Sequence, residues 1–283
     1  MRRYRPLILL LILVGLLLGF YLYTSASVHV ETIPFESHLV GKTLEYSVVL
    51  PPNYRLITSR RKHYPVLYLL HGWNGHPQSW LTETKLTAYA ARHQLIIVLP
   101  EGGNGWYTDS ATVASEKYET YILQELIPDV ESRYHALGNR EGRAIAGFSM
   151  GGYGAFKFGL KHPELFMFAA SMSGAFDAPT RVDDGSIMQA FGDASNPARA
   201  DNDLFKLIDN LMPDRLEALP YFYMDCGTED HWLNTNRDLA NLFSERKIAH
   251  EYRELPGGHD WKYWDRQVQD VLRAASQRLS PAQ

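Results

Sequence analysis

The stretch AIAGFSMGGYGAFKFG, residues 144–159, is the segment from which the fold can be predicted. A short apolar run leads into GFSMG at 147–151, which has the form G-x-S-x-G, and a helical pattern begins near Tyr153. These are the parts of a nucleophile elbow, a sharp turn that exposes a serine hydroxyl above a parallel sheet. A phosphate-binding loop, the alternative for such a turn, requires Gly-Lys-Ser/Thr, which is missing here. The sequence therefore predicts that Ser149 is a nucleophile.

The glycines around Ser149 have a physical reason. In a sharp strand-to-helix turn, side chains two positions before and after the serine would collide with the adjacent strand and helix. Gly147 and Gly151 avoid this collision because glycine has no side chain. Gly152 and Gly154 let the helix pack close to the sheet. The first amide groups of that helix then point towards the site, where they favour a negatively charged oxygen.

Apolar runs on both sides of this stretch are typical of buried strands. Most lack polar alternation and are separated by helical patterns, which indicates a mostly parallel sheet with helices on both faces. The expected strands are an antiparallel pair at 28–37 and 43–54, followed by 66–70, 95–103, 143–149, 167–174, 220–227 and 250–257. One helix is expected over 79–93, and others over 116–134, 154–162, 233–247 and 261–279. The polar, Asp-rich segment 175–210 is expected to be an insertion above the sheet, either a lid or pocket wall or an ordinary surface excursion.

The first 23 residues differ from the rest of the chain. Three arginines precede an uncharged run from Leu7 to Tyr23, which as a helix spans about 25 Å, enough to cross a bilayer core. By the positive-inside rule, we expect residues 1–27 to anchor the chain in the cell membrane and residues 28–283 to form one domain outside the cytoplasm. The alternative is a signal peptide cleaved near Thr24-Ser25-Ala26, which gives a secreted or periplasmic protein.

Composition excludes several classes of function. The net charge is −4, without a long basic run, so we expect no nucleic-acid partner. Cys226 is the single cysteine, so no internal disulfide is possible. No metal-ligand motif occurs, and no cofactor or metal is expected.

A serine nucleophile needs a base, and the base needs an orienting acid. In a fold with this elbow the chain order is Ser, acid, His. His259 follows the last strand in a glycine-flanked loop, which suits a base, whereas His231 comes directly after the acids and is too early. Asp225, Glu229 and Asp230 are the candidate acids, and we favour Asp230 because it follows the glycine turn.

Two backbone N–H groups are expected to form an oxyanion hole. One belongs to Met150, directly after the serine. The other belongs to Trp73 in the loop after strand 66–70, where His71 is expected to have a structural role. Trp106 and Tyr107 follow another strand at the same edge of the sheet and are expected to line the substrate pocket.

Five segments in order, YLLHGWNG, NGWYTD, AGFSMGGYGAFKFGLKHPELF, CGTED and GGHDWKYW, resemble the esterase D family of α/β-hydrolases over residues 35–278. That family includes S-formylglutathione hydrolases, feruloyl and tributyrin esterases, and the antigen 85 mycolyltransferases, which match less well. The resemblance implies the α/β-hydrolase fold, with Ser149 as nucleophile, Asp230 as acid and His259 as base, and with Trp73 and Met150 as oxyanion donors.

The function expected from the resemblance is hydrolysis of short acyl or aryl esters, so the expected partner is a small ester. An acyltransferase shares the first half of this reaction and differs only in the acceptor. A non-catalytic cell-surface binding module on the same scaffold is the alternative from another class. The natural ester and the oligomeric state are not predicted.

Overall fold

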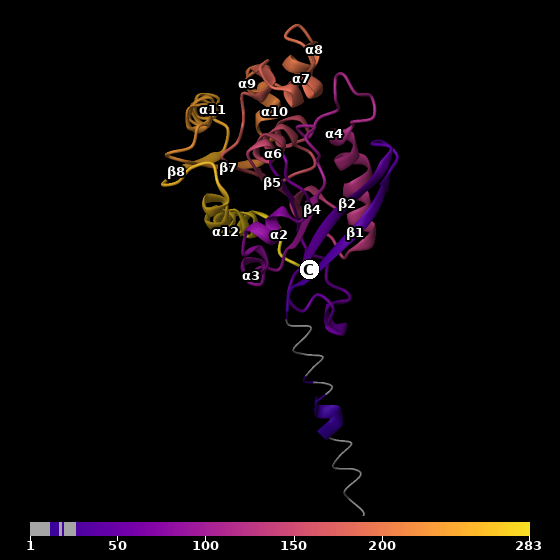
Figure 1. Cartoon of the computed structure of the whole chain (residues 1–283). Coiled ribbons are helices and arrows are strands. Elements are labelled where there is room, and N and C mark those ends of the chain that lie inside the picture. Colours follow the sequence, from indigo (N-terminus) through magenta and orange to yellow (C-terminus); the bar gives the residue numbers. More distant parts are fainter. Residues whose placement is uncertain (1–11, 17–18, 20–26) are drawn as a thin grey trace, which may run out of the picture.

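An eight-stranded sheet runs through the computed structural model, which describes residues 12–16, 19 and 27–283 (Figure 1). The strand order is β1-β2-β4-β3-β5-β6-β7-β8. The first two strands are antiparallel to each other, β2 is antiparallel to β4, and every later pair is parallel. The strands are β1 (His29–Ser37), β2 (Lys42–Leu50), β3 (Val66–Leu70), β4 (Ile96–Pro100), β5 (Arg143–Phe148), β6 (Phe168–Met172), β7 (Tyr221–Gly227) and β8 (His250–Leu255). The predicted α/β class with a mostly parallel sheet is confirmed.

Burial of the strands follows from their place in the sheet. Every residue of β3, β4, β5 and β6 is buried, as expected for central strands covered on both faces. The edge strand β1 alternates between half-buried and exposed residues along most of its length. Continuous apolar runs in the sequence therefore mark the centre of the sheet, and alternation marks the edge formed by β1.

Helices cover the two faces and create two separate apolar cores. One core contains side chains of α4 (Tyr118–Tyr121), α5 (Ile127–Arg133), α6 (Met150–Lys161) and α11 (Leu233–Glu245). A π-helical turn, Ile122–Leu126, joins α4 to α5, so the expected helix over 116–134 is essentially continuous. The other core contains side chains of α2 (Ser79–Glu83), α3 (Leu86–Ala90) and α12 (Trp261–Arg278).

The single helix expected over 79–93 is wrong, because the chain breaks it at Thr84. That residue is extended, with φ −134° and ψ 171°, and separates α2 from α3. Its hydroxyl donates to the Trp80 carbonyl and accepts the Leu86 N–H, while Asp265 of α12 accepts the Lys85 N–H at 2.7 Å. Side chains therefore satisfy the groups that a continuous helix would have paired.

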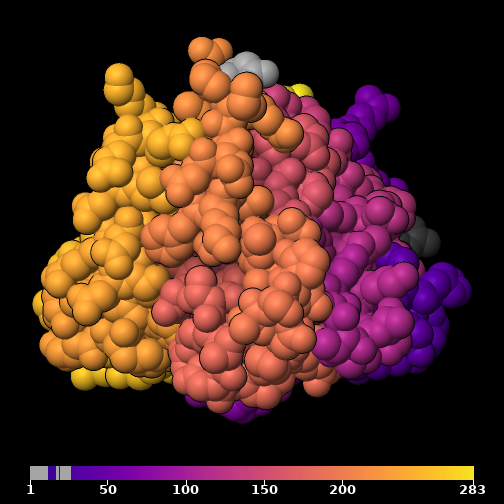
Figure 2. Space-filling view, turned by 90° about the horizontal axis from the view of Figure 1, so that it is seen from above, coloured from indigo at the N-terminus to yellow at the C-terminus, as the bar shows by residue number. Residues whose placement is uncertain are grey.

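The segment between β6 and β7 forms several short helices above the sheet. They are the 3₁₀ turn Ala178–Thr180, α7 (Gly185–Phe191), α8 (Pro197–Asn202), α9 (Leu204–Asp209) and α10 (Pro213–Leu216). Asp184, Asn196 and Asp203 cap α7, α8 and α9 by accepting backbone N–H groups of the first turn. These helices lie at the top of Figure 1, and Figure 2 shows them across the middle of that face. The expected insertion above the sheet is therefore present.

Most of the predicted membrane anchor, residues 1–27, lies outside the described residues. Among the residues that are described, none belongs to a helix long and apolar enough to cross a membrane.

Candidate active site

Ser149 lies in the sharp turn between β5 and α6. Its backbone has φ 53° and ψ −119°, a left-handed conformation that is costly for a residue with a side chain. A Cβ on Gly147 would lie 2.4 Å from the carbonyl carbon of Gly151, and a Cβ on Gly151 would lie 2.6 Å from the His71 carbonyl oxygen. At this turn the end of β5 passes close to the start of α6, which in turn passes close to the loop after β3. This close crossing holds Ser149 in its conformation and requires glycine at positions 147 and 151.

A chain of two hydrogen bonds connects Ser149 to His259 and Asp230. His259 Nε2 lies 2.9 Å from Ser149 Oγ, and His259 Nδ1 lies 2.9 Å from Asp230 Oδ2. With an ionised Asp230, the neutral imidazole carries its proton on Nδ1 and can accept the serine proton at Nε2. The rings of His259 and Trp264 pack edge to face, with 4.9 Å between their centroids and 89° between their planes. This contact restricts the orientation of the imidazole.

The loops that carry Asp230 and His259 are packed against each other. The Thr228 N–H donates to the Leu255 carbonyl at 2.9 Å, and the Glu229 N–H donates to the Gly257 carbonyl at 3.0 Å. A Cβ on Gly227 would lie 2.1 Å from the Gly257 oxygen, so this approach also depends on a glycine. The acid and the imidazole are therefore held by backbone contacts between their loops as well as by their own hydrogen bond.

Of the three candidate acids, the structure brings only Asp230 to His259. Its side chain is fully buried, and its Oδ1 accepts the Trp232 N–H at 2.8 Å. Burial by itself would raise the pKa of Asp230, but the hydrogen bonds from His259 and from the Trp232 N–H hold it below its usual value. Glu229 is exposed. Asp225 is buried in β7, where its Oδ1 accepts the Tyr263 hydroxyl at 2.9 Å.

The loop after β3 carries Trp73, the second expected oxyanion donor. The Gly75 N–H donates to the Gly72 carbonyl at 3.0 Å, which closes a turn around Trp73 and Asn74. Asn74 fixes this turn to the next loop, because its N–H donates to Asn104 Oδ1 at 2.7 Å. Within the described part of the chain, neither the Trp73 N–H nor the Met150 N–H donates to a protein acceptor. Both amides therefore lack a protein acceptor, which is what an oxyanion donor requires.

His71 lies beneath this turn and is almost fully buried. Its Nδ1 bonds the Gly72 carbonyl at 2.8 Å, and its Nε2 accepts the Gly102 N–H at 3.0 Å. This pattern requires a neutral ring with the proton on Nδ1. Both nitrogens are engaged by the backbone, as expected for a structural histidine.

Tyr107 differs from the expectation that it lines the pocket. It is fully buried under the turn after β3, and its hydroxyl donates to the His71 carbonyl at 2.9 Å. The buried ammonium of Lys157 in α6 donates to the Tyr107 carbonyl at 2.6 Å and to Glu119 Oε2 at 2.7 Å. The Tyr107 side chain therefore packs beneath the loops and does not line the cavity. Its neighbour Trp106 lines the cavity.

A cavity of about 710 Å³ opens above Ser149 and His259. Its walls combine aromatic side chains with a few polar ones, as is usual for small-molecule sites. The insertion contributes Arg181, Asp184 and Ile187, so it forms part of the pocket wall. The aromatic lining residues are Trp73, Trp106, Phe148, Trp232, Trp261 and Trp264.

Most of this lining was not predicted from the sequence. Trp232 comes two residues after Asp230, and Trp261 and Trp264 follow His259 by two and five positions. Aromatic residues next to the acid and the base were therefore the available signal. Nothing comparable marks the three lining residues of the insertion.

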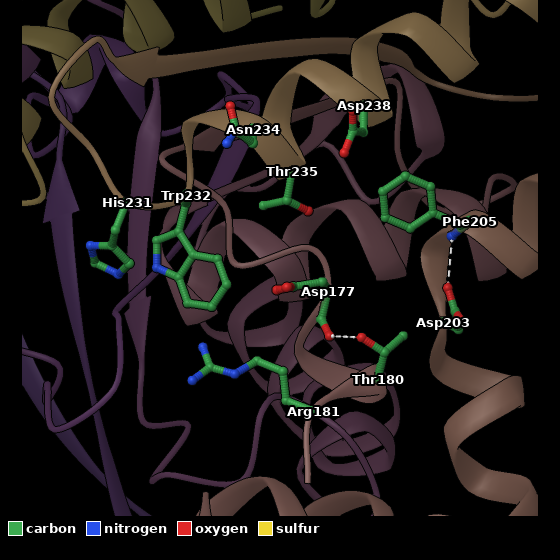
Figure 3. Close-up of a pocket in the computed structure, with 10 residues that line it drawn as sticks. All are labelled: Asp177, Thr180, Arg181, Asp203, Phe205, His231, Trp232, Asn234, Thr235 and Asp238. Atoms are coloured by element: carbon green, nitrogen blue, oxygen red, sulfur yellow. Dashed lines mark hydrogen bonds between the residues drawn. The ribbon is translucent and has the colours of Figure 1, made fainter. Parts of the chain in front are cut away.

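A second cavity, of about 630 Å³, adjoins the first. Figure 3 shows that Asp177, Thr180 and Arg181 of the insertion line this cavity together with His231 and Trp232, with Asp177 and Arg181 beside the Trp232 ring. The Arg181 guanidinium lies 5.1 Å from the centre of a Trp232 ring, and Arg181, His231 and Trp232 line both cavities. The boundary between the two spaces is therefore made of these side chains.

One group of three potential metal ligands stands out in the described part of the chain. Ligand atoms of Asp230, His231 and His259 all lie within 4.8 Å of one another.

The fold and the geometry around Ser149 define an α/β-hydrolase. Residues 37–275 match the model of the esterase family, described as "Putative esterase", and the chain belongs to this family. Membership places the chain among the carboxylic ester hydrolases.

Three known proteins illustrate the similarity. The acetyl esterase of Caldicellulosiruptor saccharolyticus is 30% identical over 217 residues, which are 73% of this chain and 81% of that protein. Esterase Rv1288 of Mycobacterium tuberculosis is 34% identical over 258 residues, which are 80% of this chain but only 54% of that longer protein. The structure of the fluorophosphonate-binding serine hydrolase F of Staphylococcus aureus has a TM-score of 0.80 and 25% identity, and the match covers 88% of this chain and 99% of that one.

The buried carboxyl of Asp225 gives a prediction about pH. Burial raises its pKa to about 8. Its proton therefore stabilises the fold fully below the pKa of an unfolded aspartate, near 4, and that stability is lost as the pH rises towards 8. Asp225→Asn keeps an acceptor for Tyr263 but cannot ionise. In wild type, this ionisation should lower the free energy of unfolding by up to about 1.4 kcal/mol per pH unit as the pH rises. We expect Asp225→Asn to lack this decrease.

Urea unfolding near pH 5 and near pH 8 measures this slope. Asp209→Asn, at an exposed carboxylate at the end of α9, is the control and should keep the wild-type slope. Equal slopes in wild type and Asp225→Asn would show that the carboxyl is ionised in the folded protein throughout this range.

Proposed function

We propose that this chain is a serine carboxylesterase that hydrolyses short-chain acyl or aryl esters. The observation that carries the proposal is the continuous chain of hydrogen bonds from Asp230 through His259 to Ser149, with 2.9 Å at each step. The strained turn holds the serine hydroxyl at the floor of the cavity. A hydroxyl, an imidazole and a carboxylate in this order are the groups that serine-based acyl transfer requires.

In the proposed reaction, Ser149 Oγ attacks the ester carbonyl carbon while His259 Nε2 takes the hydroxyl proton. The buried carboxylate of Asp230 keeps the other proton on Nδ1 and stabilises the imidazolium that forms. The imidazolium then donates its Nε2 proton to the leaving alcohol oxygen. An acyl-enzyme on Ser149 remains.

Water completes the reaction in the same geometry. His259 Nε2 removes a proton from water, which attacks the acyl carbon, and then returns a proton to Ser149 Oγ as the acid leaves. In both steps the carbonyl oxygen becomes negatively charged. The free N–H groups of Met150 and Trp73 are the proposed donors to this oxygen, with Met150 at the N-terminus of α6.

The shape and the walls of the cavity support short acyl or aryl esters. A volume of about 710 Å³ with six aromatic lining residues suits a small apolar acyl group or a ring. Trp106 is a fixed part of this wall, because its indole N–H donates to Ser186 Oγ at 3.1 Å and its ring packs against Tyr153. The name of the relative from C. saccharolyticus, acetyl esterase, agrees with a short acyl group.

Replacing the nucleophile tests this function. We expect Ser149→Ala to lower kcat for p-nitrophenyl acetate by at least about 10⁴-fold, because the proposed acyl-enzyme forms on the Ser149 hydroxyl. The melting temperature should change little. Ser195→Ala, at an exposed serine of the insertion, should retain wild-type activity. Residual activity of Ser149→Ala within tenfold of wild type would sink the proposal, and acyl transfer to added glycerol in preference to water would favour the acyltransferase alternative.

The neighbouring acids provide a sharper test of the mechanism. Asp230→Asn should lower kcat by about 10³–10⁴-fold, because an amide in place of the carboxylate leaves the imidazole in the wrong tautomer. Glu229→Gln is the matched control, since this side chain is exposed and one position away. We expect its kcat to change by less than about tenfold. The reverse order of the two kcat values would assign the role of the acid to Glu229.

We also propose that residues 1–27 anchor the enzyme in the cell membrane with the esterase domain outside the cytoplasm. The support is the order of arginines and uncharged residues in the sequence. In cells that express the full chain, we expect the esterase domain to sediment with membranes and to be digested by external protease. A mature N-terminus near Ser27 or Val28 would instead identify a cleaved signal peptide.

A further inference from the structure

His231 is a second imidazole beside the proposed base, and the esterase mechanism does not use it. Its ring centre lies 4.6 Å from that of His259, and its Nδ1 lies 3.8 Å from Asp230 Oδ1. We propose that Asp230, His231 and His259 form an inhibitory binding site for Zn²⁺ beside the cavity. The inhibition rests on the proposed function, whereas binding of the ion does not.

The geometry brings the ligands close before any ion binds. One ligand atom from each residue lies within 4.8 Å of the other two. Tetrahedral zinc with bonds near 2.0–2.2 Å places its ligands about 3.4 Å apart, so the group must contract slightly. His231 provides this movement, because 64% of its side chain is exposed. Asp230 and His259 are held by their loops, so only one ligand has to be ordered.

The chemistry of the three ligands selects the ion. Two imidazole nitrogens and a carboxylate oxygen are the ligands that Zn²⁺ takes in open sites with a fourth position for water. Divalent copper prefers similar ligands, whereas magnesium prefers oxygen and keeps its waters. The site should therefore respond to Zn²⁺ and not to Mg²⁺.

Binding stops the reaction whichever nitrogen of His259 holds the ion. If Nε2 is the ligand, its lone pair is no longer available for the serine proton. If Nδ1 is the ligand, the single proton of the neutral ring moves to Nε2, and the nitrogen that faces Ser149 becomes a donor. In both cases His259 cannot act as a base, and removal of the ion restores it.

The experiment compares the full chain, free of any affinity tag, with two variants. His231→Gln removes the ligand that is specific to this site. His76→Gln is the matched control, because His76 lines the same cavity but does not belong to the group of ligands. ZnCl₂ is titrated into each protein by calorimetry and into each hydrolysis assay, with every rate taken relative to the zinc-free rate of the same variant.

We expect ZnCl₂ to inhibit wild type and His76→Gln, EDTA to restore their activity, and equal MgCl₂ to have no effect. Inhibition of His231→Gln should need a zinc concentration at least about tenfold higher than inhibition of wild type. Even loss of a group that only hydrogen-bonds a metal ligand lowers metal affinity by about 10–100-fold. Its calorimetric affinity should fall in parallel.

Equal zinc affinity in wild type and His231→Gln, or no binding to wild type at about 1 mM, would overturn the site. Binding that depends on His231 but leaves hydrolysis unchanged would overturn the inhibition. If the zinc-free chain hydrolyses no ester, the proposed function fails, and the calorimetric comparison alone decides whether the metal site exists.

Discussion

The close crossing of the elbow over the loop after β3 is the constraint on which the rest of the site depends. Gly147 approaches Gly151, and Gly151 approaches the His71 carbonyl, so there is no room for a Cβ at either glycine. This crossing holds Ser149 at φ 53° and places Met150 at the first turn of α6, near the turn that carries Trp73. One steric condition therefore sets the direction of the hydroxyl and of the amide beside it.

The parts of the site that could be predicted are those with a local signature. GFSMG at 147–151 identifies the elbow because a side chain at Gly147 or Gly151 would collide with nearby backbone. The chain order then points to the loops after β7 and β8. The choice of Asp230 over Asp225 also followed from the sequence, because a carboxyl inside an apolar strand faces the core. In each case the residues that carry the signal lie close together in the sequence.

What could not be predicted depends on contacts between distant segments. Trp106 and Tyr107 both have positive φ, 55° and 52°, and only the first reaches the cavity. The buried ammonium of Lys157 in α6 donates to the Tyr107 carbonyl and so helps to hold the backbone of this loop. The break at Thr84 depends in the same way on Asp265 of α12. By contrast, the Asp and Asn caps of the insertion were visible in the sequence, but the weak helical periodicity between them concealed their meaning.

The insertion between β6 and β7 has a consequence for how such an enzyme changes over evolution. It provides walls for both cavities, yet Ser149, Asp230 and His259 all lie on loops outside it. Its short helices α7, α8 and α9 are capped by their own residues, so their first turns do not depend on the sheet for these bonds. Substitutions in this segment can therefore change the walls of both cavities while the three proposed catalytic residues keep their positions, so the range of accepted esters can change separately from the proposed chemistry.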